Sequence, residues 1–301
     1  MIASIIITTL NRANTLTQRS LKSALNQNFD DYEVIVVDDG SIDDTPKVMK
    51  NLVESRAGTT PRLRYYWGEN RGLPSARNFG VKMAESSLVV CLDDDNELMP
   101  DFLKETTESI KWFDAVSVGR IVKYVEKNYE DYAHAYSQDE NTKFISIDWG
   151  WLMKKEIFQK IQYDEKMLAN EDADFGLQFT KAGLFFTTID KPLSIAFDQE
   201  GDPKLSMSYP SKRILDGIQY FLDKNLPEYA GYPNELRYIY RLAGRRFYLG
   251  GQKKKGISYF WKSFRAMPRL ETLTQLCAIL LGWKVYDTFM TLEEKLASKL
   301  R

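Results

Sequence analysis

The chain has little of what several large enzyme classes need. Its 301 residues include a single histidine, His134, which disfavours both a serine–histidine catalytic pair and a metal site built from several histidines. Its two cysteines, Cys91 and Cys277, are too few for a disulfide framework or a cysteine zinc site and fit a reducing compartment. The 42 acidic and 41 basic residues nearly balance, so no overall positive field attracts nucleic acid.

Long hydrophobic runs are also missing. No apolar run approaches the roughly 20 residues that a membrane-spanning helix needs. The N-terminal stretch Met1–Ile7 has no basic residues ahead of it and runs into Thr8 and Thr9, so it predicts a first strand and not a signal peptide. We therefore expect a cytoplasmic protein, and the length suits one large or two medium domains.

What the chain does contain is an alternation of strand and helix patterns. Apolar or β-branched runs predict buried strands at Ser4–Thr8, Glu33–Val37, Leu63–Trp67 and Val89–Leu92. Helices are expected at Leu16–Gln27, Asp43–Arg56, Ser75–Ala84 (with Ser75 as its cap) and Pro100–Phe113. This order predicts an α/β fold with a mostly parallel sheet flanked by helices, whose ligands bind beyond the carboxyl ends of the strands.

Carboxylates cluster at those predicted strand ends. Asp93, Asp94 and Asp95 follow one strand, and Asp38 and Asp39 follow another. Neighbouring carboxylates repel one another and would destabilise a loop that binds no ligand. They become favourable when a hard divalent cation lies between them and a phosphate. The pattern predicts a metal–diphosphate site, while an acidic turn that caps the helix after Pro100 remains an alternative for the Asp93 cluster.

The middle of the chain is less regular. Ala115–Val125 alternates like a strand, and Glu126–Lys143 is polar and tyrosine-rich, which predicts a loop or a short helix. A helix that runs to Lys181 is expected after the acidic stretch Asn170–Phe175. Asp172 falls near its N-terminus, where the helix dipole favours an ionised carboxylate, although Glu171 and Asp172 could simply cap the helix.

After Pro210 the pattern becomes helical. Helices are expected at Ile214–Asn225, Asn234–Leu249, Lys255–Met267 and Leu270–Leu300, which divides the chain into domains 1–210 and 211–301. The second domain mixes basic and aromatic residues, which fits either a solvated face over an ordinary core or docking onto an anionic membrane. The residues concerned are Arg245, Arg246, Phe247, Tyr248, Lys253, Lys254, Lys255, Tyr259, Phe260, Trp261, Lys262, Phe264 and Arg265.

Over about residues 1 to 210 the chain resembles the inverting family 2 glycosyltransferases of the GT-A fold, the fold of nucleotide-diphospho-sugar transferases. The resemblance rests on several motifs in the family's order. They are Ser4–Arg12 (SIIITTLNR), Val36–Ser41 (VVDDGS), Asn70–Gly72 (NRG) with Ala76–Gly80 (ARNFG), Leu92–Asn96 (LDDDN), Tyr163–Glu165 (YDE) and Glu171–Asp172.

The resemblance implies a role for each matching position. Asp39 accepts a hydrogen bond from the nucleotide base, Asp93 lies near the ribose, Asp95 holds Mg²⁺ or Mn²⁺ on the diphosphate, and Asp172 is the general base. The other donor-binding positions are Thr8, Thr9, Leu10, Asn11, Arg12, Arg77 and Asp94. The chain departs from the family's usual residues in three places: Leu10 replaces a frequent aromatic, Asn96 replaces a frequent aspartate, and Asp198–Glu200 occupies the stretch after the last sheet strands where a histidine is frequent.

The reaction implied is metal-dependent, hexosyltransferase-like transfer from a nucleotide-diphosphate sugar, taken to be a UDP-sugar, by one displacement with inversion. Acceptors of surface polysaccharide or lipid-linked glycan synthesis are implied, with Trp149, Trp151 and Glu171 as candidate contacts, although buried tryptophans are equally expected there. The helical domain is a candidate for acceptor, oligomer or inner-membrane-surface contacts. Two alternatives remain: a sugar-nucleotide pyrophosphorylase, which would want a glycine-rich loop after the first strand, and a non-catalytic relative that binds a partner.

Overall fold

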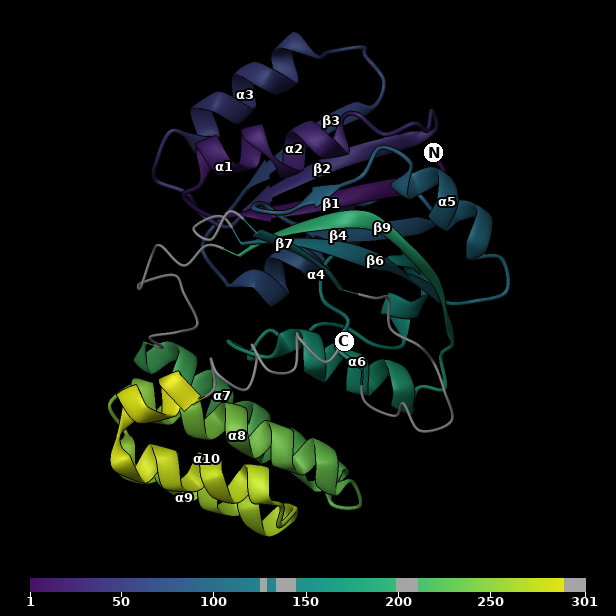
Figure 1. The fold of residues 1–301 in the computed structure, drawn as a ribbon. Coiled ribbons are helices and arrows are strands. Elements are labelled where there is room, and N and C mark those ends of the chain that lie inside the picture. The colour runs from purple at the N-terminus through teal and green to yellow at the C-terminus, as the bar shows by residue number, and fades with distance from the viewer. Residues whose placement is uncertain (125–128, 134–144, 199–210, 290–301) are drawn as a thin grey trace. The chain divides into compact units, whose positions relative to one another are not determined.

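The structure is a computed structural model and describes residues 1–124, 129–133, 145–198 and 211–289. The chain divides into two compact units, Met1–Glu200 and Gly201–Arg301, which are considered separately below. The first unit is built on a mixed sheet, and the second consists of helices (Figure 1). The predicted α/β fold with a helical C-terminal extension is therefore confirmed.

Four parallel strands form the first half of the sheet, in the order β3 (Arg62–Trp67), β2 (Tyr32–Asp38), β1 (Ala3–Thr9), β4 (Leu88–Asp93). Helices cover both faces, so every residue of β1 and β2 is buried, as their continuous apolar runs predict. The register pairs Thr9 with Asp38 and Thr8 with Asp93. The strand ends that precede the acidic clusters therefore lie at one edge of the sheet.

The second half of the sheet is mixed. Antiparallel β8 (Leu152–Lys154) joins β4 to β6 (Ala115–Tyr124), and β6 pairs in parallel with β9 (Phe186–Asp198). Two short antiparallel strands complete it: β5 (Glu97–Leu98) on β9 and β7 (Tyr129–Ala133) on β6. Strand β7 lies in the stretch Glu126–Lys143, for which a loop or short helix was expected; the rest of that stretch lies outside the described residues.

Helices lie on both faces of the sheet (Figure 1), and a hydrophobic layer holds them against each face. Helices α1 (Ala13–Gln18), α2 (Ser20–Ala24), α3 (Thr45–Ser55) and α5 (Phe102–Ser109) contribute to one layer. Helices α4 (Leu73–Met83) and α6 (Glu171–Lys181), with the 3₁₀ turn η2 (Lys155–Gln159), contribute to the other. Because helices cover both faces of the sheet, the loops that can form a binding site lie at its carboxyl edge.

Two predicted helices differ locally from those observed. The helix expected over Leu16–Gln27 starts at Ala13 and breaks at Arg19, whose backbone (φ −115°, ψ −90°) is not helical. Helix α4 begins at Leu73, so Ser75 lies inside the helix and is not its cap. The start falls earlier because Gly72 supplies the positive φ of 97° at the N-cap, and Pro74 is favourable in a first turn.

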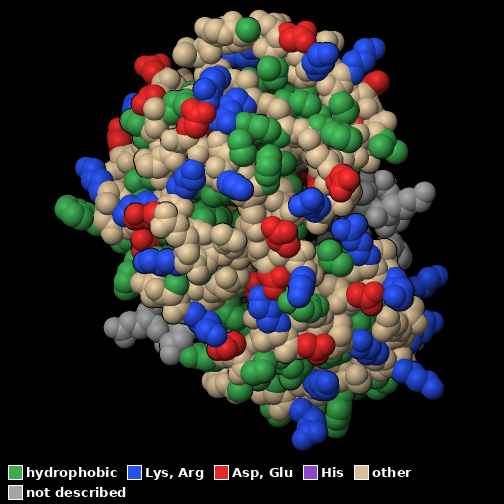
Figure 2. All heavy atoms as spheres, turned by 180° about the vertical axis from the view of Figure 1, so that it is seen from behind, with side chains coloured by type: hydrophobic (Ala, Val, Ile, Leu, Met, Phe, Trp, Pro, Cys, Tyr) green, Lys and Arg blue, Asp and Glu red, His purple; other side chains and the backbone are tan. Residues whose placement is uncertain are grey.

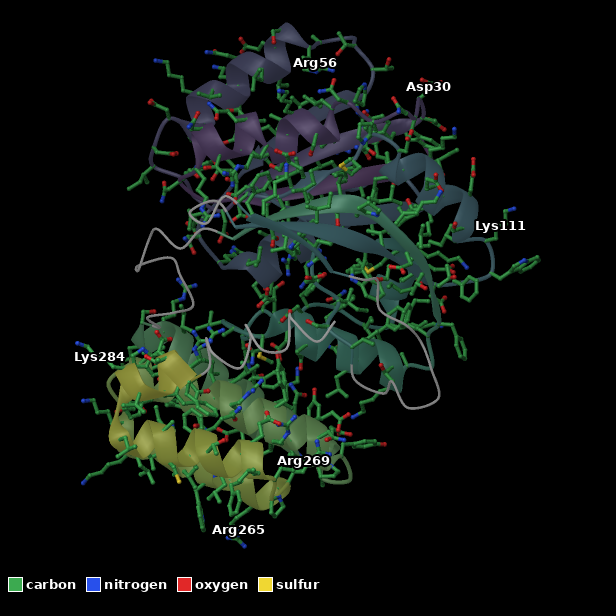
Figure 3. All side chains as sticks on the ribbon, in the orientation of Figure 1. Asp30, Arg56, Lys111, Arg265, Arg269 and Lys284 are labelled. Carbon is green, nitrogen blue, oxygen red and sulfur yellow. The ribbon has the colours of Figure 1, made fainter. Side chains whose placement is uncertain are left out.

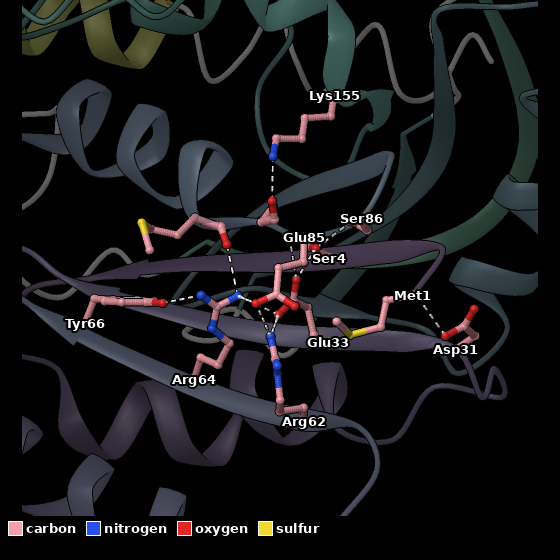
Figure 4. Close-up of polar contacts among 12 residues, drawn as sticks. Met1, Ser4, Asp31, Glu33, Arg62, Arg64, Tyr66, Glu85, Ser86 and Lys155 are labelled. Atoms are coloured by element: carbon pink, nitrogen blue, oxygen red, sulfur yellow. Dashed lines mark hydrogen bonds and ion pairs between the residues drawn. The ribbon is translucent and has the colours of Figure 1, made fainter.

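A buried ion-pair network closes the opposite, amino edge of the sheet (Figure 4). The Glu33 side chain is fully buried and accepts hydrogen bonds from Arg64 Nη1 at 2.9 Å, Arg62 Nη2 at 3.1 Å and Ser4 Oγ at 2.8 Å. The backbone N–H of Glu85 also donates to Glu33. The contacts join β1, β2, β3 and the segment after α4, so this carboxylate has a structural role.

The second unit is a helical bundle. It contains α7 (Lys212–Asn225), the 3₁₀ turn η3 (Leu226–Tyr229), α8 (Pro233–Leu249), α9 (Lys253–Ala266) and α10 (Leu270–Leu281). The single helix expected over Leu270–Leu300 is wrong, because α10 ends at Leu281 and is followed by Gly282, whose φ is 119°. Helical residues resume at 283–289, and 290–300 lie outside the described residues. Within the part of the chain that the structure describes, no helix is both long and apolar enough to cross a membrane.

Candidate active site at the carboxyl edge of the sheet

The loop after β2 fixes the two carboxylates Asp38 and Asp39 differently. Asp38 accepts hydrogen bonds from Ser41 N–H at 2.7 Å and Tyr65 Oη–H at 2.6 Å, so it stabilises its own turn. Asp39 accepts from the backbone N–H groups of Arg71 and Gly72, both at 2.8 Å. Asp39 therefore ties the loop before α4 to β2, and a nucleotide base would have to use lone pairs beyond these two contacts.

The loop after β1 leads from the sheet to Arg12. Thr8 and Thr9 are buried, and Thr9 Oγ1 donates to Asp94 Oδ2 at 2.7 Å. Asn11 has a left-handed backbone (φ 55°) and connects this loop to the one after β2, because its N–H donates to Ser41 Oγ at 2.7 Å. Leu10 is 37 % exposed. The loop thus exposes the apolar side chain of Leu10 beside a turn that the Asn11–Ser41 hydrogen bond holds in place.

Two carboxylates of the acidic triplet Asp93–Asp95 at the end of β4 contact the Arg12 guanidinium. Arg12 Nη1 donates to Asp94 Oδ1 and to Asp95 Oδ2, each at 2.9 Å. Burial raises the pKa of Asp94 to about 6, although Arg12 and Thr9 act in the opposite direction. Burial and the charge of Asp93 raise the pKa of Asp95. The ionised carboxylates here would be stabilised by additional positive charge.

This donor set fits a divalent cation that is shared with a substrate. Asp95 is partly exposed (28 % of its side chain) and already accepts a cationic donor. Across the described ranges, no group of three or more His, Cys, Asp or Glu side chains converges to hold a metal ion by itself. Mg²⁺ and Mn²⁺ favour oxygen ligands, and Mg²⁺ in particular is commonly held by one or two carboxylates together with phosphate oxygens and water.

Arg77 connects the triplet to the start of α6. It projects from α4 and is only 2 % exposed, and it donates from Nη2 to Asp93 Oδ1 at 2.8 Å and from Nη1 to Glu171 Oε1 at 3.1 Å. Its guanidinium carbon lies 5.3 Å from the centroid of the Tyr163 ring. Burial alone lowers the pKa of Arg77, but Asp93 and Glu171 raise it well above its usual value. Residues far apart in sequence are therefore held together by one buried cation.

Asp172 lies in the first turn of α6, which begins after Asn170, a left-handed residue with φ 62°. Its Oδ2 accepts a short hydrogen bond from Ser146 Oγ, and its backbone oxygen accepts from Ile147 N–H at 3.1 Å. The side chain is thus oriented by a neighbouring segment in addition to its helix. Asn170 occupies the N-cap without a side-chain capping hydrogen bond, so a capping role for Glu171 and Asp172 stays an alternative.

A second ion pair lies beside Asp172 and was missed by sequence reasoning. Arg120 of β6 forms two hydrogen bonds with Asp148, at 2.7 and 3.0 Å. Burial raises the pKa of Asp148, Arg120 opposes this, and the charges of Asp172 and Asp93 raise it further. Asp148 therefore belongs to the same electrostatic cluster as Asp93 and Asp172.

The two tryptophans proposed as acceptor contacts are buried. Trp149 is 6 % exposed and packs in one core layer, and Trp151 is 1 % exposed and packs in the other. The Arg120 guanidinium carbon lies 4.1 Å from the centroid of the Trp149 ring. Contact of either ring with a sugar stays a prediction, and the burial favours a packing role for both.

Two comparisons by sequence match known proteins. A family model described as "Glycosyl transferase family 2" matches residues 4–171. GalNAc(5)-diNAcBac-PP-undecaprenol beta-1,3-glucosyltransferase of Campylobacter jejuni is 33 % identical over 135 residues, which are 44 % of this chain and 36 % of that protein. The uncharacterised glycosyltransferase EpsJ of Bacillus subtilis is 26 % identical over 234 residues, 70 % of this chain and 64 % of EpsJ. The chain thus spans less than two thirds of either relative.

Solved structures match over more of the chain. Residues 1–349 of S. aureus TarS in complex with UDP-GlcNAc superpose with a TM-score of 0.58 and 18 % identity, covering 89 % of this chain and 82 % of that one. A second structure of S. aureus TarS gives a TM-score of 0.55 and 17 % identity, covering 89 % of this chain and 50 % of that one. At this identity the likeness establishes a shared fold, and it confirms the GT-A architecture expected from the motifs.

Proposed function

Because the chain belongs to glycosyl transferase family 2, we propose that it transfers a sugar from a nucleoside-diphosphate sugar to an acceptor hydroxyl, with inversion at the anomeric carbon. One observation carries this proposal. Arg77 pairs with Asp93 at the end of β4 and with Glu171 at the start of α6, so it holds the first turn of α6, which carries Asp172, against the edge assigned to the donor. A pyrophosphorylase or a non-catalytic binding protein would not need a base carboxylate held in this position.

Donor binding is assigned to the loops at the carboxyl edge. Asp39 and the Thr8–Arg12 loop are proposed to hold the nucleotide, with Asp93 and Arg77 towards the ribose. A UDP-sugar is the donor we favour, because TarS, which shares the fold, was solved in complex with UDP-GlcNAc. Asp95, with Asp93 and Asp94 beside it, is proposed to hold Mg²⁺ or Mn²⁺. A divalent cation there supplies Lewis acidity that offsets the charge of the departing diphosphate.

The chain's own residues are proposed to do the remaining work. Asp172 removes the acceptor proton as the bond to the anomeric carbon forms, which requires its carboxylate within about 3 Å of that hydroxyl. Ser146 orients this carboxylate through its hydrogen bond to Oδ2. A single base on the face opposite the leaving group gives one in-line displacement and inverted stereochemistry, as in inverting glycosidases.

The acceptor is proposed to be a glycan, either lipid-linked or part of a surface polysaccharide. The C. jejuni relative is named for an undecaprenol-linked acceptor, which supports the lipid-linked class. Glu171 lies beside Asp172 and is the acceptor contact we favour among the residues predicted. Burial raises its pKa and the charge of Asp172 adds to this, although Arg77 acts in the opposite direction.

The test is a thermal-shift screen of nucleoside-diphosphate sugars with and without Mn²⁺, followed by NMR of the product. We expect one donor to stabilise the protein in a Mn²⁺-dependent manner, because a ligand that binds only the folded state raises the melting temperature. The anomeric configuration of the product should be opposite to that of the donor. A retained configuration, or the absence of stabilisation by every donor, would contradict the proposal.

A further inference from the structure

Helix α10 presents an exposed apolar face. Leu270, Leu280 and Leu281 are 77 %, 59 % and 75 % exposed, and Leu273 is 40 % exposed. With Cys277, which is also exposed, they recur at the spacing that places side chains on one side of a helix. This outward face continues for the length of the helix.

The opposite side of α10 is already occupied by the core of the helical unit. Leu276 and Ile279 are buried and pack in one cluster with Phe260 of α9. The helix contains one charged residue, Glu271, which accepts a hydrogen bond from Arg237 Nη1 at 2.8 Å. The core therefore accounts for the inner face, and the apolar character of the outer face needs a separate explanation.

Cations stand at both ends of this face. Arg265 and Arg269 precede α10 and Lys284 follows it, and all three side chains are exposed. Figure 3 shows Arg265 pointing away from the helical unit and Lys284 beyond the opposite end of α10 from Arg269. Lys and Arg side chains also project from the helical unit in the rear view of Figure 2. An apolar strip bounded by cations complements a surface that has an apolar interior and anionic groups above it.

The segment after α10 places aromatic side chains next to the apolar face of that helix. Gly282 turns the chain, and a hollow of about 500 Å³ follows, lined in part by Trp283, Tyr248 and Val285. Lys253 Nζ lies 5.9 Å from the centroid of the Tyr248 ring, and Val285 is 44 % exposed. Aromatic rings beside basic groups are typical of protein segments at the depth of lipid headgroups.

We propose that the outward face of α10 docks onto an anionic lipid bilayer, with Leu270, Leu273, Leu280 and Leu281 entering the interface. The flanking cations then contact the headgroups, as in interfacial amphipathic helices. The cations at both ends favour a bilayer as the occupant, because anionic headgroups present negative charge along the whole strip. The proposal does not depend on the transferase proposal, since its residues lie outside the carboxyl-edge site.

This location differs from the one that the sequence suggested. The interleaved basic and aromatic stretch of α8 and α9 fitted either a solvated face over an ordinary core or a membrane surface, and the burial of Phe247, Tyr259 and Phe260 supports the core. Lys255 Nζ lies 3.9 Å from the centroid of the Phe247 ring, and Lys262 Nζ 4.6 Å from that of Tyr259, so these cations cover the core. Most of the aromatic character of α8 and α9 therefore belongs to the core of the unit.

The experiment is cosedimentation of the full chain with vesicles of phosphatidylglycerol and phosphatidylcholine in equal parts, or of phosphatidylcholine alone. We expect binding to the anionic vesicles only, weakening as salt is raised. Replacing Leu280 and Leu281 together by Ser should lower the partition coefficient by about tenfold or more, because their side chains no longer enter the interface. Reversing the charges with Arg269→Glu and Lys284→Glu should lower it by a similar factor.

Trp112→Ser is the matched control, because Trp112 is a 91 % exposed apolar residue in the first unit. It should leave vesicle binding unchanged, and circular dichroism melting curves should confirm that all variants fold. The proposal is overturned if wild type does not bind anionic vesicles at low salt, or if the leucine variant binds as well as wild type. It is also overturned if light scattering shows a dimer that the leucine variant dissociates while vesicle binding stays absent, since α10 would then be an interface between two copies.

Discussion

Arg12 Nη1 lies 2.9 Å from Asp95 Oδ2, the same distance that separates it from Asp94 Oδ1. A guanidinium thus contacts the carboxylate that we assign to a metal ion. Arg12 neutralises the acidic cluster when the donor is absent, and a cation that binds Asp95 must compete with it. The contact also explains how carboxylates can be crowded at the end of β4 without unfolding the turn.

Replacing this arginine should therefore strengthen metal binding in the absence of nucleotide. In Arg12→Gln we expect the affinity for Mn²⁺ alone to rise by about tenfold, because one charge-assisted hydrogen bond of ~1.5 kcal/mol need no longer be broken. Electron paramagnetic resonance of free Mn²⁺ measures this directly. Arg19→Gln is the control, because Arg19 donates to the backbone oxygen of Asp95 and not to its carboxylate. Weaker Mn²⁺ binding in Arg12→Gln than in wild type would refute the competition.

Loss of the proposed base should lower the rate of sugar transfer without weakening donor binding. In Asp172→Asn we expect kcat to fall by about 10²–10⁴-fold, the usual contribution of a positioned base. Calorimetric affinity for the donor should stay within about twofold of wild type, because the assigned donor contacts come from other loops. Asp30→Asn, at an exposed residue beside the amino edge of the sheet, serves as control (Figure 3). Near-normal turnover of Asp172→Asn on the true acceptor would remove this residue from the mechanism.

Ser146 is predicted to position Asp172. Ser146→Ala should lower kcat by about tenfold with little change in the donor KM, because a hydrogen bond to a charged group is lost next to the reacting atoms. Ser146→Thr keeps the hydroxyl and should restore most of the activity, which a purely packing role would not predict. Equal activity of the Ala and Thr variants would argue against positioning.

Glu33 should make folding stability depend on pH. Burial raises its pKa, but the hydrogen bonds from Glu85 N–H, Arg64, Ser4 and Arg62 outweigh this and hold the pKa below its usual 4.5. A lowered pKa means that the unfolded chain binds the proton more tightly than the folded one. The stabilisation is therefore complete above the unfolded pKa and is lost as the pH falls through the lower folded pKa.

Glu33→Gln should consequently lower the free energy of unfolding by about 3–5 kcal/mol at neutral pH, because two arginines lose a buried partner. The gap from wild type should shrink in acid. Glu85→Gln is the matched control: Glu85 contacts the same arginines but is 49 % exposed, so its loss should cost less than about 1 kcal/mol. Urea denaturation at several pH values measures both, and equal costs for the two variants would show that burial of Glu33 is unimportant.

Sequence patterns predicted the frame of the site well, because that frame follows from local rules. Continuous apolar runs fix β1, β2 and β4, and parallel pairing then brings Asp38 and Asp93 to one edge. The contacts that join this edge to α6 could not be predicted from local sequence patterns. Arg77 and Glu171 are 94 positions apart, and Ser146 and Asp172 are 26 apart, so no local period links them.

The misplaced features have identifiable physical causes. The spacing of apolar residues does not distinguish the exposed side of an apolar helix from its buried side, so the exposed face of α10 was not predicted. The same spacing continues past the end of α10, so one long helix was predicted in place of two. Gly282 was the available signal, since glycine commonly follows the last turn of a helix. Asp148 carried a weaker signal, as an isolated carboxylate in an apolar stretch that is expected to need a buried partner.

The central claim is that Asp95 and its neighbours hold a divalent cation against a diphosphate, and calorimetric titration of UDP with and without Mn²⁺ tests it most directly. In wild type we expect Mn²⁺ to raise the affinity for UDP by about tenfold or more, because the cation contacts protein and phosphate together. In Asp95→Asn this gain should vanish while metal-free UDP binding persists. If UDP binds wild type with equal affinity in the presence and absence of Mn²⁺, or if Asp95→Asn keeps the full gain, the claim is contradicted.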